Sequence, residues 1–176
     1  MSQATRTDVA RQVREALGRD PGAMTMRLAR DLGVPEAEVV RALPEGRSVE
    51  LDAGRWEEII RAFEALGPVH VIVSNGATTL EAVGQCGGFS TWGEFFNVQT
   101  KTLDMHVRWP QLGAAFAVEK RSHMNEDVTT LSVQFFDRAG QAAFKVFFNF
   151  GGKPTAQRRQ QFAELRAKFA LGGATP

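Results

Sequence analysis

The spacing of apolar residues changes abruptly at Gly67, and this change restricts the fold more than any other feature of the sequence. Before Gly67, apolar residues recur every three or four positions, as on one face of a helix. After it they alternate with polar residues and are rich in Val and Phe, as in strands, until helical spacing returns near residue 153. This order predicts a single α+β domain, with a helical part over 1–66, an antiparallel sheet over 67–152 and a C-terminal helix over 153–176.

Gly and Pro residues divide the helical part into four segments. The first two end at the turns 20–22 and 33–35, and the third ends before Pro44. The fourth begins after Asp52, its expected N-cap, and places its apolar residues on one face: Trp56, Ile59, Ile60, Phe63 and Leu66. We expect these segments to form one helical layer on the sheet.

The strand region contains three hairpin signals. Asn75 and Gly76 follow an alternating segment and predict a tight turn. The turn 137–140 separates the segment 131–136 from the Phe-rich segment 141–150. Between these two hairpins, the segments 95–98 and 103–109 predict a third pair of strands. The glycines at 84, 87 and 88 indicate a bent loop rather than a phosphate site, because no helix begins after them.

Composition and motifs give no support to several classes of function. A formal charge of +1 provides no overall field to attract nucleic acid. Three His and one Cys lack the spacing of a zinc site, and the sequence has neither a phosphate-binding glycine loop nor a nucleophile elbow. No apolar run is long enough for a membrane-spanning helix, and the charged first residues do not form a signal peptide. We therefore expect a cytoplasmic protein without side-chain catalysts or membrane insertion.

Residues 24–43 have the spacing of a helix-turn-helix, with Ala29, Gly33 and Val39 at the usual packing positions. This pattern supports an alternative function, that of a regulatory or interaction module. The second helix, however, begins with Glu36 and Glu38, and nucleic acid would repel carboxylates at the positions that read bases. The same carboxylates complement the positive end of the helix dipole, which favours a structural helical cap on the sheet.

Short segments spread along nearly the whole chain match one family in order and spacing. These segments are Leu32-Gly33-Val34, Val39 to Pro44, Leu66 to Val69, Leu80-Glu81, Phe96-Asn97-Val98, His106-Val107, Phe116 to Lys120, Gln134 to Asp137, Gly140 and Lys145-Val146-Phe147. Together they resemble the ChuX/HutX haem-utilisation carriers and, more distantly, each half of the HemS-type haem-trafficking proteins. The resemblance implies half of a HemS-like fold, and a cytosolic homodimer that binds or stores haem and passes it to a receiving protein.

The resemblance also implies where the haem iron is held. In ChuX-like members haem is associated with two histidines, of which one matches His106 and the other falls at about Ser74. A tyrosine of some relatives falls at about Phe95, and the iron-binding histidine of the HemS type falls at about Leu80. Three of these four positions therefore lack the ligand found in relatives.

His106 is the candidate axial ligand for haem iron, although a surface strand residue is an equal interpretation. Alternation in 103–109 places Asp104, His106 and Arg108 on the face away from the core, so that Arg108 could pair with a propionate. The chain contains no Tyr, which excludes a tyrosinate ligand. His123 and Met124 lie in a polar segment that is either a solvated loop or the source of a second ligand.

The other candidate ligands have structural interpretations. We expect His70 to be a packed or hydrogen-bonded strand residue, and Cys86 lacks the following Pro of thiolate haem motifs. The sequence thus predicts a haem carrier without turnover. The helix-turn-helix module is one alternative, and haem degradation, in which the cofactor supplies the reactivity, is another.

Overall fold

The computed structural model describes residues 5–172 and confirms the α+β class. The α-helices are α1 Arg6–Arg19, α2 Thr25–Leu32, α3 Glu36–Arg41, α4 Trp56–Ala62 and α5 Ala156–Phe169. The strands are β1 Ser48–Leu51, β2 Pro68–Ser74, β3 Thr79–Gln85, β4 Ser90–Trp92, β5 Phe95–Gln99, β6 Asp104–Arg108, β7 Leu112–Arg121, β8 Thr129–Asp137 and β9 Ala142–Phe147. Three short 3-10 helices are η1 Ala53–Arg55, η2 Phe63–Leu66 and η3 Trp109–Gln111.

Side-chain caps begin α1 and the segment that leads into α4. Thr5 and Asp8 form a reciprocal capping box at the start of α1. The predicted cap Asp52 accepts a hydrogen bond from the Gly54 amide at 2.9 Å, so it begins the 3-10 turn that leads directly into α4. The fourth predicted segment is therefore present as η1, α4 and η2 in succession.

The strands form two antiparallel sheets, whereas the sequence predicted one. A six-stranded sheet has the order β1-β7-β8-β9-β2-β3, and a three-stranded sheet has the order β4-β5-β6. The chain passes from one to the other through the predicted bent loop. At Gly88, with φ of 58°, a Cβ atom would lie 2.0 Å from the carbonyl oxygen of Gln99, so this close approach requires glycine.

Strand β1 lies inside the segment for which the sequence predicts helices. It pairs with β7, which places Leu51 opposite Ala115 and buries it. A strand of four residues is too short for its alternation to be read reliably, and its partner lies far along the chain. The prediction of a helical part over 1–66 therefore missed β1, which lies between the third and fourth helical segments.

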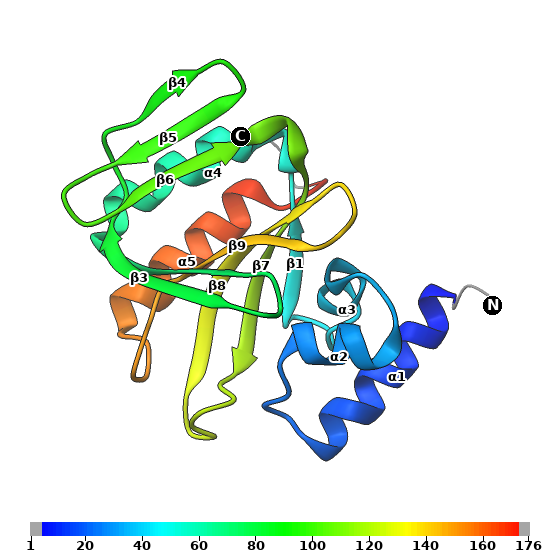
Figure 1. Cartoon of the computed structure of the whole chain (residues 1–176). Helices are drawn as coiled ribbons and strands as arrows, with labels where there is room; N and C mark the ends of the chain where they lie inside the picture. The colour runs from blue at the N-terminus through cyan, green and yellow to red at the C-terminus, as the bar shows by residue number, and fades with distance from the viewer. Residues whose placement is uncertain (1–4, 173–176) are drawn as a thin grey trace.

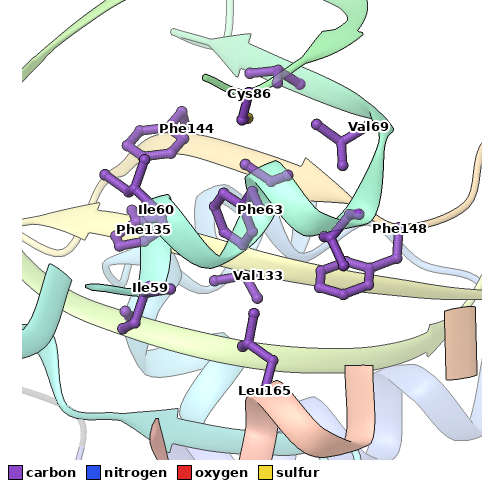
Figure 2. Close-up of a cluster of buried hydrophobic side chains, with 14 of the residues drawn as sticks. Ile59, Ile60, Phe63, Val69, Cys86, Val133, Phe135, Phe144, Phe148 and Leu165 are labelled. Carbon is purple, nitrogen blue, oxygen red and sulfur yellow. The ribbon is translucent and has the colours of Figure 1, made fainter. Parts of the chain in front are cut away.

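The two faces of the six-stranded sheet are covered differently (Figure 1). One face, which we call the closed face, carries Val133, Phe135 and Val146 and is covered by α4, α5 and the small sheet. In its core Phe63 makes edge contacts with Phe135 and Phe148, with ring centroids 6.5 and 6.3 Å apart (Figure 2). The core of this face is a continuous cluster of aliphatic and aromatic side chains.

The opposite face, which we call the open face, is covered by α1–α3 at one end only. There the three helices pack on Phe116, Val118 and Phe136. The prediction of one helical layer is wrong, because apolar residues point to both faces of the central strands and each group needs its own cover. Beyond α1–α3, the strand register places polar and apolar side chains together on the open face. Lys145 of β9 lies between Gln134 of β8 and Ile72 of β2, and Phe147 lies opposite Ser132.

Candidate functional site

A cleft of about 650 Å³ lies on the open face, between the α2–α3 region and strands β2, β3, β7, β8 and β9. Its volume falls within the roughly 300–1,000 Å³ that is usual for small-molecule sites. The lining is apolar over much of its extent. The apolar contributors include Met24, Met26, Ile72, Val118, Phe147 and Phe150. This is the hollow into which a flat hydrophobic ligand could fit.

One wall of the cleft carries an imidazole. His70 of β2 is largely buried, with 16% of its side chain exposed, and its ring packs near Phe147 and Phe150, with centroids 6.0 and 5.8 Å away. Its Nε2 lies 2.8 Å from a carboxylate oxygen of Glu81 on the neighbouring strand β3. The expectation that His70 is a packed or hydrogen-bonded strand residue is confirmed by its contacts with these two rings. The sequence did not reveal that this residue also lines a cleft.

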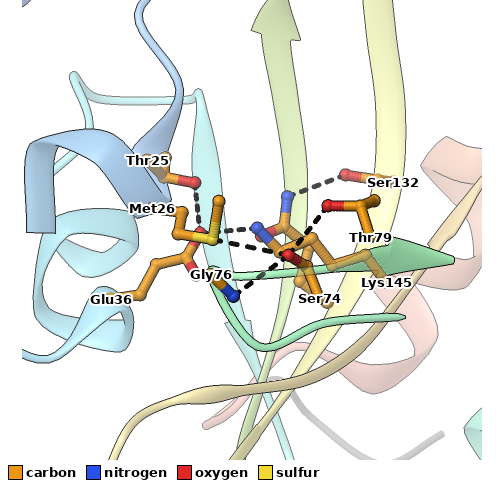
Figure 3. Close-up of polar contacts among 9 residues, drawn as sticks. Thr25, Met26, Glu36, Ser74, Gly76, Thr79, Ser132 and Lys145 are labelled. Atoms are coloured by element: carbon orange, nitrogen blue, oxygen red, sulfur yellow. Dashed lines mark hydrogen bonds and ion pairs between the residues drawn. The ribbon is translucent and has the colours of Figure 1, made fainter. Parts of the chain in front are cut away.

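Where α2 and α3 meet the sheet, the cleft contains a buried polar cluster (Figure 3). Glu36, at the first turn of α3, is 2% exposed. Its Oε1 accepts hydrogen bonds from the Thr25 hydroxyl at 2.6 Å and from the Lys145 ammonium at 2.5 Å. The pair connects α3 to β9 and neutralises both charges within the lining of the cleft.

Lys120 of β7 brings a second ammonium group to the cleft. Its Nζ donates hydrogen bonds to the carbonyl oxygens of Gly22 and Arg121, at 2.8 and 2.9 Å. Among the residues described, no carboxylate lies within 4 Å of it. The pKa of Lys120 is lowered to about 8, mainly by burial; the charge of Asp20 opposes this shift and the charge of Lys145 contributes to it. An anionic group on a ligand would stabilise this ammonium.

The floor of the cleft also carries an amide that is incompletely satisfied. Gln134 is 5% exposed, and its Nε2 donates to the Ser132 hydroxyl at 3.0 Å. Within the described part of the chain, its Oε1 has no hydrogen-bond partner. Buried polar groups normally find a partner. The amide is therefore available to a polar group of a ligand or to a water molecule.

Of the residues proposed from sequence to bind haem, the structure places His123 and Met124 at the cleft. Both lie in the connection between β7 and β8, and both are exposed. The turn between α1 and α2 lies close to this connection, since a Cβ at Gly22 would lie 3.0 Å from the Ser122 carbonyl oxygen. His70, His123 and Met124 thus line the same cleft although they are distant in sequence.

The structure places His106 and Arg108 elsewhere, on the outer face of the small sheet. As predicted, both are exposed while Val107 between them is buried. Nδ1 of His106 lies 2.7 Å from Oδ1 of Asn97, and its Nε2 lies 3.4 Å from Asp104. Arg108 pairs with Glu94 at 2.8 Å. Neither His106 nor Arg108 contributes to the cleft on the open face.

The positions at which relatives carry other ligands are dispersed. Ser74 lines the cleft, where its hydroxyl contacts the sulfur of Met26 at 3.8 Å. Leu80 is 62% exposed on the edge strand β3, and Phe95 lies on β5 of the small sheet. These three residues therefore do not converge on one site.

Helix α3, the recognition helix of the helix-turn-helix interpretation, is only six residues long and packs against the sheet. Glu36, Ala37, Val39 and Val40 are all buried. The remaining carboxylate in its first turn, that of Glu38, forms ion pairs with Arg41 and Arg6. A helix in this position cannot enter a groove of nucleic acid without leaving the sheet.

Two further classes of site find no support in the structure. Over residues 5–172, no helix is both long enough and apolar enough to cross a bilayer. Within that same range, the His, Cys, Asp and Glu side chains form no group of three or more that could hold a metal ion.

Comparison with known proteins identifies one family. The model of a family described as haem utilisation ChuX/HutX matches residues 49–165. A solved structure described as the heme binding protein ChuX has a TM-score of 0.76 and 21% identity, covering 89% of this chain and 97% of that chain. A protein from Agrobacterium tumefaciens has a TM-score of 0.79 and 26% identity, covering 96% of this chain and 98% of that chain. Among curated proteins, none matches this sequence significantly.

A longer protein contains the same fold. ChuS of Escherichia coli O157:H7, described as a heme degrading enzyme, has a TM-score of 0.79 and 22% identity. The match covers 98% of this chain and 49% of ChuS, so this chain spans about half the length of that protein. This confirms the expected relation to one half of a larger fold of the same kind.

Proposed function

This chain belongs to the ChuX/HutX haem-utilisation family, and we propose that it binds haem in the cleft on its open face and carries it without chemical turnover. The observation that supports this site is the combination, in one cleft, of an apolar slot, imidazole side chains and a partly desolvated ammonium group. A haem site needs these three components, for the ring, the iron and the propionates respectively.

For the ring, the apolar side chains of the sheet and of α2 face each other across the cleft. Phe147 and Ile72 come from neighbouring strands, and Met24 and Met26 come from the start of α2. Methionine adapts its shape to a flat aromatic surface and makes favourable sulfur contacts with it. These residues would bind the tetrapyrrole by burying its faces.

For the iron, we propose His123 as the ligand from the cleft, with Met124 as its neighbour on the same loop. His70 is a poorer candidate, because its Nε2 is already engaged by Glu81. His123 is exposed at the cleft, and the α1–α2 turn lies beside it. A histidine on a loop can approach the iron as the ligand enters, without disturbing the sheet.

For the propionates, we propose Lys120, because the other two cations that line the cleft are paired, Lys145 with Glu36 and Arg121 with Glu126. Its ammonium group has backbone carbonyl partners and can pair with a carboxylate of the ligand without breaking an ion pair. Haem itself supplies iron chemistry when it is bound. The residues of this chain would position it and exclude water, and no side chain in the cleft has the arrangement of a nucleophile with its base among the residues described.

His106 and Arg108 offer a second candidate site on the small sheet. The Nδ1 of His106 lies against the side-chain oxygen of Asn97, which favours a proton on Nδ1 and a lone pair on Nε2, although the Asp104 carboxylate lies 3.4 Å from that Nε2. This is the orientation that axial histidines require. The surrounding surface is exposed, however, and Arg108 is paired with Glu94. We therefore give priority to the cleft.

We further propose that the chain acts in the cytoplasm as a homodimer and hands haem to a receiving protein. The match to the ChuX/HutX family supports this assignment. Degradation of haem remains the competing function, because the half-length match to ChuS is to a protein described as an enzyme. Product analysis of the haem complex with a reductant present separates the two. Intact haem supports a carrier, whereas a linear tetrapyrrole would contradict it.

Titration with haemin, followed by the Soret band, tests the site. We expect stoichiometric binding by the wild type, a shifted and weakened band in His123→Ala, and an unchanged band in His106→Ala. Lys120→Met should weaken binding with little change in the band, because it alters a propionate contact and leaves the iron ligand in place. A loss confined to His106→Ala would assign the ligand to the small sheet and contradict the cleft proposal.

A further inference from the structure

The ion pair between Glu36 and Lys145 is placed where a ligand would meet it. Both residues line the cleft, and their side chains are only 3% and 17% exposed. A link between α3 and the sheet would not need charges, because apolar side chains in the same position join two elements at lower cost in desolvation. The position of the pair within the cleft therefore calls for an explanation based on the ligand.

The cleft contains two ammonium groups in different states. That of Lys145 is neutralised by the Glu36 carboxylate, which the Thr25 hydroxyl also holds in place. That of Lys120 has only carbonyl partners among the residues described. The buried amide of Gln134 lies on β8 opposite Lys145, whereas Lys120 lies opposite Thr130, four residues along the same strand. A ligand carboxylate near Gln134 would therefore meet the Glu36 charge as well as Lys145.

We propose that Glu36 is a specificity-determining residue, a built-in carboxylate that neutralises Lys145 and so limits the number of ligand carboxylates that the cleft accepts. This inference rests on the proposed function of the cleft as a tetrapyrrole site. With Glu36 in place, Lys120 alone of the two lysines is available to the ligand. Without its charge, Lys145 becomes a second anion-binding group.

Metal-free porphyrins test the inference separately from iron ligation. Protoporphyrin carries two carboxylates and coproporphyrin carries four, and binding of each is followed by the fluorescence of the porphyrin itself. The quantity compared is the ratio of the two affinities within each variant, because differences in ring shape then cancel. Glu36→Gln keeps the size of the side chain and its ability to accept the hydrogen bond from Thr25, and removes only the charge.

We expect Glu36→Gln to raise the preference for coproporphyrin over protoporphyrin by roughly tenfold, since a nearby partly buried charge changes the stability of an anion by about that factor or more. The matched control is Glu38→Gln, on the same helix. Glu38 also takes part in ion pairs, with Arg41 and Arg6, and does not line the cleft. The control changes the net charge equally and should leave the ratio unchanged.

The double variant Glu36→Gln with Lys145→Gln removes both charges, and its result is decisive if Glu36→Gln alone does not fold. We expect wild-type affinity for both porphyrins, because two uncharged Gln side chains replace an ion pair whose net charge is already zero. A loss of tenfold or more for both would mean that Lys145 binds the ligand directly, and would overturn the inference. An equal shift of the affinity ratio in Glu36→Gln and Glu38→Gln would overturn it too. Failure of the wild type to bind haemin or either porphyrin would overturn the proposed function along with the inference.

Discussion

The two faces of the six-stranded sheet are built from the same strands and are covered differently. The closed face is a continuous core of Phe, Val, Leu and Ile side chains covered by α4, α5 and the small sheet. The open face is covered by α1–α3 at one end only, and beyond them it carries the cleft with Glu36, Lys120 and Lys145 in its lining. Alternation along each strand lets one set of residues stabilise the fold while the other set remains free for a ligand.

The strongest test of this division compares one phenylalanine from each face. Phe63 is fully buried on the closed face, between Phe135 and Phe148. Phe147 is partly buried on the open face and lines the cleft. We expect Phe63→Ala to lower the free energy of unfolding by about 3–5 kcal/mol, because it leaves a cavity in a packed core.

Phe147→Ala should cost less than about 1.5 kcal/mol, since the cleft already exposes part of the ring. It should instead weaken haemin binding. Urea unfolding and haemin titration of both variants provide the measurements. Equal losses of stability would show that the open face belongs to the core after all.

A second test concerns the packing of α3 on the open face. Gly140, with φ of 78°, lies in the β8–β9 turn, and its carbonyl oxygen accepts a hydrogen bond from the Ala37 amide at 3.0 Å. A Cβ there would lie 2.7 Å from the Cβ of Pro35. At Gly46, with φ of 76°, a Cβ would meet nothing within 4 Å. An Ala at either position would therefore adopt a strained left-handed conformation, but only at Gly140 would its Cβ also meet a neighbouring residue.

We expect Gly46→Ala to lower the free energy of unfolding by about 1–2 kcal/mol, the cost of a left-handed conformation for an L-residue. Gly140→Ala should cost about 2–4 kcal/mol, because the new methyl group also pushes α3 away from the sheet. Thermal unfolding measures both. If the two variants lose the same stability, α3 is free to move, and the cleft is less well defined than its buried ion pair suggests.

A third test uses the pKa of Lys120, which burial lowers from 10.5 to about 8. Between pH 8 and 10.5 the unfolded chain therefore binds more protons at this residue than the folded chain does. The free energy of unfolding rises with pH wherever the unfolded state binds more protons. The ligand-free protein should consequently gain stability from Lys120 as the pH rises through this window.

The expected size of the gain is on the order of 1 kcal/mol after allowance for partial exposure of the side chain. Lys120→Met lacks the titrating group and should not show this gain. The wild type should therefore gain unfolding free energy relative to the variant between about pH 7.5 and about pH 9.5. Urea unfolding at the two pH values measures this. A difference that does not depend on pH would mean that the ammonium is fully hydrated, and would weaken its assignment to the ligand.

These two faces also differ in how well they can be predicted from sequence. Val69 and Val71 of β2 and Val146 of β9 belong to the closed-face core, as alternation predicted. Alternation depends only on neighbouring residues, and so it locates a core. It also placed His106 correctly on an outward face, although it could not indicate whether that face adjoins a hollow.

The cleft could not be predicted, because it depends on which element covers which face. Glu36 and Lys145 are 109 residues apart and meet only when α3 packs on the sheet. Lys120 lies on β7, whose Ala-rich sequence gives a weak strand signal, and its partner Gly22 is 98 residues away. Alternation with Val in a strand predicted the orientation of His70, but its neighbours along the chain do not indicate which elements form the opposite side of the cleft.

The smallest expected effect tests whether the small sheet shares the function of the open face. Glu94 and Arg108 form an exposed ion pair, with both side chains more than half exposed, and such pairs contribute less than about 1 kcal/mol. Glu94→Gln would release Arg108 to bind a propionate if His106 held the iron. We expect a change in unfolding free energy below about 0.5 kcal/mol and an unchanged haemin affinity, because we propose that haem binds in the cleft and not on the small sheet. Tighter haemin binding in this variant, lost again on His106→Ala, would move the site from the open face to the small sheet.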